Sequence, residues 1–328
     1  MNTHELPMII FTVLGQMSVG AFVVLGLVQV FASRRFGAAA IDKVTDPALY
    51  AIGPALVLGL GASMLHMNDV MNTLNVFRHL DSSWLSREIV FGLAFAGLGF
   101  VFAAAQWFKW GTARLRQALA AVTALVGLGL VASMSMIYYT LVTVPAWHSW
   151  ATPVQFFTTT FLLGTLAVGA ALTGAVVWRR RRTTAADATA RTTADDVARA
   201  GDAVTASGAG EVPVSELLTV CLKGIGVGAV VLLGVEFLII PLFISSLATA
   251  GGAAAQSAAV FSGAWFIARL VLVFTGAGLL AVYLFRYAAT HANPRTLAIL
   301  AGSAFLLVLA GEFIGRSLFY DSMIRLGM

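Results

Sequence analysis

The chain has 328 residues, of which 59% are hydrophobic and only 11% are charged, and its mean hydropathy is +0.89. Soluble domains carry about a quarter charged residues, so this composition excludes a water-soluble protein and indicates an integral membrane protein. The formal charge of +5 does not indicate a nucleic-acid partner, because the basic residues lie beside apolar stretches, where membrane topology explains them.

Eight apolar stretches are long enough to cross a membrane, since a transmembrane helix needs about 20 mostly apolar residues. Barrel strands would instead appear as short alternating segments, so we expect helices. The opening "MNTHELP" lacks the basic region of a signal peptide, and we expect the first stretch to be retained as a span. The predicted fold is an all-α bundle of eight transmembrane helices. They cover residues 8–33, 48–66, 86–108, 115–140, 154–178, 216–247, 259–287 and 296–319.

Lysine and arginine are distributed unevenly between the two ends of these spans. The loops after the first, third, fifth and seventh stretches are basic or flanked by basic residues, as at Arg34, Lys109, Arg179 and Arg286. The loops after the fourth and sixth stretches contain no lysine or arginine. Because basic residues are retained on the cytoplasmic side, both the N and the C terminus are predicted to lie outside.

The connection between the second and third spans, "SMLHMNDVMNTLNVFRHLDSSWLSREI", is unusually polar for this chain. Apolar residues recur every three or four positions from Met67 to Trp84, which predicts an amphipathic helix lying in the outer membrane interface. Most of its polar residues are explained by solvation of the top of the bundle. His66 and Glu88 differ, because they border the hydrocarbon, where ionisable residues are rare and usually functional. Such a pair could accept the two protons released by a hydroquinone.

The histidines and the single cysteine limit the cofactors that this chain can hold. A membrane b-type haem requires two histidines that face each other inside the bilayer, and one thiol cannot hold an iron–sulfur cluster. We therefore expect no haem, no iron–sulfur cluster and no metal site, so electrons must leave through a partner protein. The residues concerned are His4, His66, His79 and His148 at the outer edge, His291 in an inner loop, and Cys221.

Residues 183–212 interrupt the apolar pattern. The segment is rich in Ala, Thr, Asp and Gly and lacks apolar periodicity, which predicts a disordered or loosely helical cytoplasmic linker. It would separate residues 1–182, with five spans and the candidate quinol site, from residues 213–328, with three spans. The arginines at 179–182 are most simply a topology anchor that contacts lipid phosphates, with a docking role as the alternative.

Four charged residues interrupt the last three spans, and "GEFIGR" places two of them one helical turn apart. Because buried charges pair, the simplest interpretation is a network that holds the helices together. A proton route is the alternative that stays open. The four residues are Glu236, Arg269, Glu312 and Arg316.

Four stretches together carry a resemblance to a known family: "HELPMIIFTVLGQMSVGAFVVL", "SMLHMNDVMNTLNVFRHLDSSWLSREI", "TVPAWHSWATPVQFF" and "AGEFIGRSLFYDSMIRLGM". The chain resembles the DmsC family, the membrane-anchor subunits of the dimethyl sulfoxide reductase type, which are related to the polysulfide-reductase (NrfD-like) anchors. The resemblance runs from end to end except for residues 183–212.

The resemblance implies a haem-free, multi-pass protein of the cytoplasmic (inner) membrane that oxidises menaquinol. It would pass electrons to an iron–sulfur subunit that supplies a molybdenum bis-guanine-dinucleotide catalytic subunit, supporting anaerobic respiration on dimethyl sulfoxide or a similar acceptor. The chain would then be the quinol-oxidising subunit of a complex, and not itself catalytic toward the terminal acceptor.

Particular residues take their expected roles from the same resemblance. His66, at the end of "SMLH", matches the family's quinol-site histidine, and Glu88, in "SREI", matches its functionally sensitive glutamate. Further residues match or lie beside family positions and are expected to line the pocket: His4, Gln16, Asn75 and Arg87.

Two alternatives to this function stay open. A polysulfide-reductase-like anchor would share the eight-helix plan but serve another terminal substrate, which a different subunit would determine. An ion-coupled secondary transporter would use Glu236, Arg269 and Glu312 as an ion path. The sequence shows no inverted repeat and no broken helices at matching positions, which disfavours the transporter.

Overall fold

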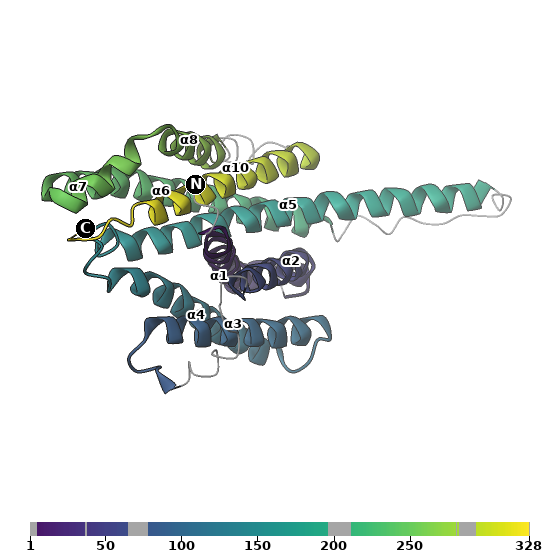
Figure 1. Cartoon of the computed structure of the whole chain (residues 1–328). Coiled ribbons are helices and arrows are strands. Elements are labelled where there is room, and N and C mark those ends of the chain that lie inside the picture. The colour runs from purple at the N-terminus through teal and green to yellow at the C-terminus, as the bar shows by residue number, and fades with distance from the viewer. Residues whose placement is uncertain are drawn as a thin grey trace.

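The computed structural model describes residues 5–36, 38–64, 78–195, 211–279, 281 and 293–327, and the regular elements among them are all helical. Figure 1 shows α3, α5 and α10 running across the view, with α1 drawn nearly end-on between α5 and the pair formed by α3 and α4. The elements are α1 (Leu6–Phe36), α2 (Ala38–Met64), α3 (Trp84–Trp107), α4 (Ala113–Tyr139), α5 (Ala151–Asp195), α6 (Glu211–Ala250), α7 (Gly252–Ala259), the 3₁₀ turn η3 (Val260–Ser262), α8 (Ala264–Val273), the π-helical η4 (Phe274–Gly278) and α10 (Pro294–Asp321).

The all-helical membrane class is confirmed, and the described residues supply six or seven candidate spans. Six helices (α1, α3, α4, α5, α6 and α10) are long and apolar enough to cross a membrane. The segments Gly252–Ser262 and Ala264–Gly278 meet at a 60° bend and add a seventh if they form one span. The predicted span over residues 48–66 lies largely in α2, which contains Pro47 and Pro54 and is not among the six. The structure therefore does not confirm eight spans.

Three helix starts carry side-chain caps. Ser83 and Thr112 precede α3 and α4 in an extended conformation, and their hydroxyls accept hydrogen bonds from the backbone N–H of Ser86 and Leu115. Asn293 does the same before α10, whose first residue is Pro294. Such side chains satisfy backbone donors that a helix start leaves unpaired, and proline suits the first turn because its fixed φ is helical.

The two predicted polar segments are described only in part. Residues 65–77, which hold most of the predicted interfacial helix, lie outside the described residues, and residues 78–83 form turns. Helix α5 continues past the arginines at 179–182 to Asp195, so the first part of the predicted linker is regular helix, as its alanine content favours. Residues 196–210 lie outside the described residues.

Helix α5 is the longest element of the described chain. Its 45 residues would measure about 68 Å, against a hydrocarbon thickness of about 30 Å, so its C-terminal part extends past the other helices (Figure 1). The Arg182 guanidinium lies 4.0 Å from the centre of the Trp178 ring, a contact typical of a helix leaving the apolar layer.

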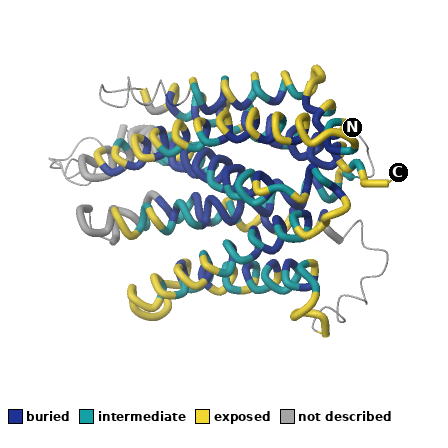
Figure 2. The backbone as a smooth tube through the Cα atoms, turned by 90° about the vertical axis from the view of Figure 1, so that its left-hand side faces the viewer, coloured by how far each residue is buried: buried dark blue, intermediate teal, exposed yellow. Residues whose placement is uncertain are grey.

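Helices α1 and α5 form the centre of the bundle. Helix α1 packs against α2, α5 and α4, while α5 also packs against α10 and α6; α3 packs mainly on α4, and α8 mainly on α10. Figure 2 shows the buried segments concentrated on the helices inside the bundle, with exposed residues on the outer helices. Many large apolar side chains are exposed, as expected where lipid replaces water as the solvent.

Helices α1 and α5 come into backbone contact at one crossing point. A Cβ added to Gly20 would overlap the carbonyl of Thr160, and a Cβ added to Gly164 would overlap the backbone of Gly20. Membrane helices associate closely where small residues let their backbones approach, since no hydrophobic force drives them together in lipid. The central helix pair therefore requires glycine at both positions.

We expect Gly164→Ala to separate α1 from α5 and to destabilise the protein by about 1–3 kcal/mol, because its methyl group would meet backbone that cannot rotate away. The measurement is the thermal unfolding midpoint in detergent. The matched control is Gly174→Ala on the same helix, where a Cβ meets no atom within 4 Å. Equal midpoints for the two variants would contradict this account of the crossing.

Candidate functional site

Half of the predicted pocket residues can be placed. Gln16, Arg87 and Glu88 lie among the described residues, on α1 and at the start of α3. His4 lies in residues 1–4, and His66 and Asn75 lie in residues 65–77, which are outside the described residues, so their place near Glu88 stays a prediction.

Glu88 lies in the second turn of α3 and is buried, with 9% of its surface exposed. Among the described residues, its carboxyl group has no hydrogen-bond donor and no cation within ion-pair distance. It lies close enough to the phenol groups of Tyr138 and Tyr320 to interact with them electrostatically. A carboxylate without a cation can take up a proton without breaking an ion pair.

Tyr138 and Tyr320 belong to a chain of hydroxyl groups that crosses three helices. The Tyr138 and Tyr320 hydroxyls are 2.9 Å apart, and the Tyr320 hydroxyl is 3.1 Å from Oγ1 of Thr12. Thr12 donates its single proton to the Met8 carbonyl at 2.7 Å, so its oxygen must accept from Tyr320. Tyr320 in turn accepts from Tyr138. The hydroxyl chain has one direction, from α4 through α10 to α1, and it leaves acceptor capacity on the Tyr138 oxygen.

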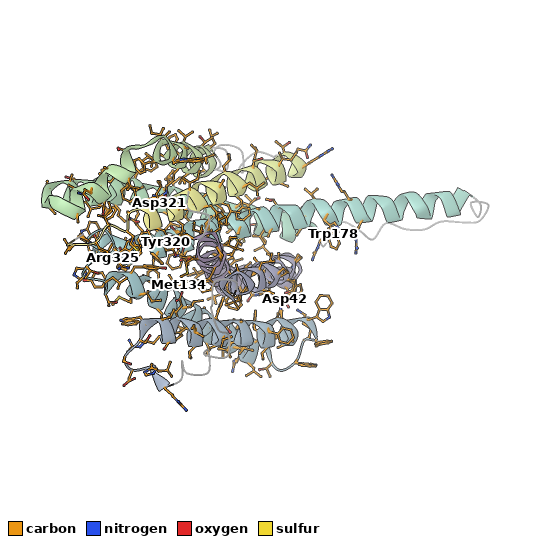
Figure 3. The ribbon with its side chains drawn as sticks, in the orientation of Figure 1. Asp42, Met134, Trp178, Tyr320, Asp321 and Arg325 are labelled. Carbon is orange, nitrogen blue, oxygen red and sulfur yellow. The ribbon has the colours of Figure 1, made fainter. Side chains whose placement is uncertain are left out.

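An aromatic cluster surrounds this hydroxyl chain. The Trp147 and Phe319 rings are stacked with centres 5.5 Å apart, and Trp147 Nε1 donates to the Phe319 carbonyl at 2.8 Å. Phe156 packs against Tyr138 and Phe319. Figure 3 places Tyr320 toward the end of the bundle where the C terminus lies. Packed aromatic rings exclude water from the hydroxyl groups and hold their geometry.

Gln16 lies one helical turn beyond Thr12 on α1, and Arg316 lies one turn before Tyr320 on α10. Gln16 is completely buried, and its Oε1 accepts a hydrogen bond of 3.0 Å from Nη2 of Arg316. The Arg316 guanidinium also lies 3.9 Å from the centre of the Phe156 ring. Two successive turns of α1 therefore face two successive turns of α10 through polar contacts.

Arg87 is placed differently from Gln16 and Glu88. It is partly buried and donates hydrogen bonds of 2.7 Å to the carbonyls of Leu80 and Asp81, while its guanidinium lies 4.1 Å from the centre of the Trp84 ring. These contacts stabilise the turn that precedes α3, and none of them is directed at the tyrosine pair.

The predicted charge network forms around Arg269, on α8. Its Nη2 donates to Glu236 Oε1 at 2.6 Å and lies 3.7 Å from Glu312 Oε1. Thr159 on α5 donates to Glu312 Oε2 at 2.8 Å. The network therefore joins α5, α6, α8 and α10, and all of its members are buried. The helix-holding interpretation agrees with this geometry.

Gly315 makes space for this network. A Cβ at position 315 would overlap the guanidinium of Arg269, so only glycine lets that side chain lie between the two carboxyl groups. Arg316, the fourth residue of the predicted network, has no carboxylate within ion-pair distance among the described residues, although it lies one turn from Glu312. Arg316 donates to Gln16 instead, and the cation paired with Glu312 is Arg269.

The opposite end of α3 carries a separate charged cluster. Lys109 Nζ lies 2.8 Å from Asp42 and 3.3 Å from Asp46, and Gln106 also donates to Asp46. Burial opposes the charge on Lys109, but the two carboxylates outweigh it and raise the pKa of its ammonium group.

A nearby cavity of about 10 Å³, lined by Gln29 and Thr45 among others, has room for about one water molecule, which is far too little for a quinol ring. Figure 3 shows Asp42 far from Tyr320 along the bundle.

Sequence reasoning missed Thr12, Tyr138 and Tyr320 as site residues. Tyrosines near span ends are ordinarily interpreted as interfacial anchors, and 182 positions separate Tyr138 from its partner. The one available signal was that both tyrosines end apolar stretches predicted to finish on the same membrane face as Glu88.

We expect Arg269→Met to destabilise the protein by about 3–5 kcal/mol, because it leaves two buried carboxyl groups without their cation. Adding Glu236→Gln and Glu312→Gln should recover much of the loss, since no unpaired charge then remains at the network. Thermal unfolding in detergent measures both, with Arg295→Met, at an exposed position of α10, as the control. An unfolding midpoint unaffected by Arg269→Met would show that the network does not hold the helices.

Comparison with known proteins gives matches over the whole sequence. The family model described as DMSO reductase anchor subunit (DmsC) matches residues 1–321. The sequence is 29% identical to the C component of the anaerobic dimethyl sulfoxide reductase of Escherichia coli (strain K12), over 99% of this chain and 97% of that protein. It is 27% identical to the anaerobic dimethyl sulfoxide reductase component YnfH of the same organism, again over 99% of this chain and 97% of that protein.

A further match is partial. The sequence is 33% identical to the C component of the sulfite dehydrogenase of Allochromatium vinosum, over 39% of this chain and 42% of that protein.

Proposed function

The chain belongs to the DMSO reductase anchor subunit (DmsC) family, and from this premise we propose that it oxidises menaquinol and passes the electrons to an iron–sulfur partner subunit. It is a membrane-embedded member of a family that anchors reductase complexes. The partner would supply a molybdenum bis-guanine-dinucleotide subunit that reduces dimethyl sulfoxide or a similar acceptor. The full-length similarity to a component of the Escherichia coli dimethyl sulfoxide reductase supports this arrangement in the cytoplasmic membrane.

The observation that carries the proposal is the buried Glu88 carboxyl group, which has no cation partner among the described residues and lies within electrostatic range of Tyr138 and Tyr320. Oxidation of a hydroquinone releases two electrons and two protons, so the site needs proton acceptors in an otherwise apolar layer. Glu88 accepts one proton from a quinol hydroxyl in this mechanism. The acceptor capacity of the Tyr138 oxygen then allows a hydrogen bond to the protonated group.

The second proton acceptor in this proposal is His66, whose imidazole titrates near neutral pH. His4, Asn75 and Gln16 complete the pocket around the head group. Quinol would enter from the lipid between the early helices, and the protons would leave on the outer side. Since electrons also leave through a partner on that face, this subunit alone would move no charge across the membrane.

The proposed topology has eight spans with both termini outside. It is supported by the distribution of basic residues, which gather where α3 ends and where α5 leaves the bundle, at the end opposite to Glu88 and Tyr320. The residues that form the candidate site would then share the outer face.

A second candidate keeps the site and changes the terminal substrate. The partial similarity to a component of a sulfite dehydrogenase favours the view that such anchors serve complexes with different catalytic subunits. The substrate spectrum of the complex isolated with this protein distinguishes the two.

We expect Glu88→Gln to lower menaquinol-dependent reduction of the terminal acceptor by about 10²–10⁴-fold, because the amide has nearly the same shape but cannot accept the proton. Activity of the assembled complex with reduced viologen, which delivers electrons to the partner subunits directly, should stay unchanged. Asp321→Asn, at an exposed position that ends α10, serves as the control. Menaquinol turnover at the level of the unmodified protein would exclude Glu88 as the acceptor.

The topology predicts opposite labelling of two introduced cysteines in a Cys221→Ser background, since the chain has a single cysteine. Met323→Cys, exposed after α10, should react in intact cells with a maleimide that does not cross the cytoplasmic membrane. Ala113→Cys, exposed at the start of α4, should react only after the membrane is opened. The reverse pattern would place both termini inside.

A further inference from the structure

Gln16 has a side chain that is only half satisfied. It is completely buried on α1, and its Oε1 accepts from Arg316, but its Nε2 has no hydrogen-bond partner among the described residues. Nearly all buried polar groups in proteins are hydrogen-bonded, and an unpaired buried donor costs about 1–3 kcal/mol. A buried amide that keeps an unpaired NH₂ group therefore indicates a missing acceptor.

Arg316 determines which end of the Gln16 amide is unpaired. A guanidinium group carries donors only, so it can face the amide oxygen but not the amide nitrogen. The orientation of the amide is thus dictated by its neighbour, and the NH₂ group must point away from Arg316. If Arg316 were absent, the amide could rotate by 180° and present its oxygen instead.

Arg316 is itself held in place without using its charge in an ion pair. Its guanidinium lies 3.9 Å from the centre of the Phe156 ring and 5.3 Å from that of Phe319. Among the described residues no carboxylate lies within 4.0 Å of it, and the nearby Glu312 is paired with Arg269. Cation–π contacts with these two rings hold the guanidinium in place, and its Nη2 donor with it.

The acceptor that fits this donor is a neutral oxygen in an apolar layer. Gln16 lies one turn from Thr12, which ends the hydroxyl chain from Tyr138 and Tyr320, and both tyrosines lie within electrostatic range of Glu88. A quinone carbonyl, or the hydroxyl oxygen of a hydroquinone, is an uncharged acceptor on an apolar ring, whereas an anion would find its counter-charge only in Arg316. An ordered water molecule is the other acceptor that such a donor commonly binds.

We propose that Arg316 is a positioning residue that orients the Gln16 amide, so that its NH₂ group donates to an oxygen of the quinol head group. This inference rests on the proposed quinol oxidation at Glu88 and assigns a second residue of α10, beside Tyr320, to the site. Gln16 makes the contact with the substrate, and Arg316 acts only through Gln16.

The decisive variant is Gln16→Glu in the intact complex. Glutamate keeps the shape and the acceptor oxygen that faces Arg316, but it removes both N–H donors. If Gln16 served only to satisfy Arg316, this variant would bind quinol normally, because an ion pair would replace the hydrogen bond. If the NH₂ group binds the head group, a hydroxyquinoline N-oxide quinol analogue should bind about tenfold more weakly or worse.

Four further variants make the result independent of how well Gln16→Glu folds. Gln16→Met removes donor and acceptor and should weaken binding to a similar extent. Arg316→Lys keeps a charged donor and should retain binding within a few-fold, whereas Arg316→Met frees the amide to rotate and should weaken it. The double variant Gln16→Met with Arg316→Met should be no worse than Gln16→Met alone, because Arg316 acts through Gln16. Arg295→Met on the same helix is the control.

The measurements are the dissociation constant of the analogue by fluorescence quenching and the KM and kcat for a short-chain menaquinol, each normalised to the viologen-dependent activity that reports assembly. The expected signature is a raised KM and a weakened analogue affinity. Normal analogue binding in both Gln16 variants would overturn the inference and would mean that Gln16 Nε2 binds only water. Additive losses in the double variant would also overturn it. A different result would show that the proposed function itself fails: the Glu88→Gln variant would then turn over menaquinol at the normal rate.

Discussion

Polar side chains buried in a bilayer cannot form hydrogen bonds with water, so each must find its partner within the protein. In this protein that constraint falls most heavily on α10. Its last three turns carry Glu312, Arg316 and Tyr320, which reach Arg269 on α8, Gln16 on α1, and Tyr138 on α4. The remaining architecture depends on these contacts, because they connect the first helices of the chain with the last.

The same constraint separates two functions along α10. Glu312 belongs to a cluster with Arg269 and Glu236, in which charges compensate one another and helices are held together. Tyr320 and Arg316 contact Thr12 and Gln16 on α1, and Tyr320 lies within electrostatic range of Glu88, which has no cation partner among the described residues. A stabilising network and the proposed proton-accepting site thus lie at successive turns of one helix. Gly315 supports the first by making space for the Arg269 guanidinium.

Much of the fold could be predicted from the sequence, since hydropathy alone locates membrane helices. The predicted stretches 86–108 and 115–140 correspond closely to α3 (Trp84–Trp107) and α4 (Ala113–Tyr139). The bend between η3 and α8 was missed, and α5 continues as regular helix to Asp195, where a disordered or loosely helical linker was predicted. Hydropathy does not register a break within an apolar run, and it cannot distinguish a polar helix that continues into water from a linker.

The candidate site was predictable from the sequence only where an ionisable residue interrupts or borders an apolar span. Glu88 does so, because it is a carboxylate at the edge of an apolar stretch. Tyr138 and Tyr320 do not, because their pairing depends on how α4 and α10 pack. Arg316 shows the limit most clearly. Its spacing from Glu312 favours a pair on one helix, but in the folded protein its guanidinium lies over the Phe156 ring and donates to the buried Gln16 oxygen instead.

The most direct test of the central claim is a structure of the intact complex with a menaquinol analogue bound. We predict that the quinol head group lies among α1, α3, α4 and α10 and contacts both the Glu88 carboxyl group and the Gln16 amide. A head group bound elsewhere, for example beside Lys109 at the opposite end of α3 or within the Glu236–Arg269–Glu312 network, would contradict the account.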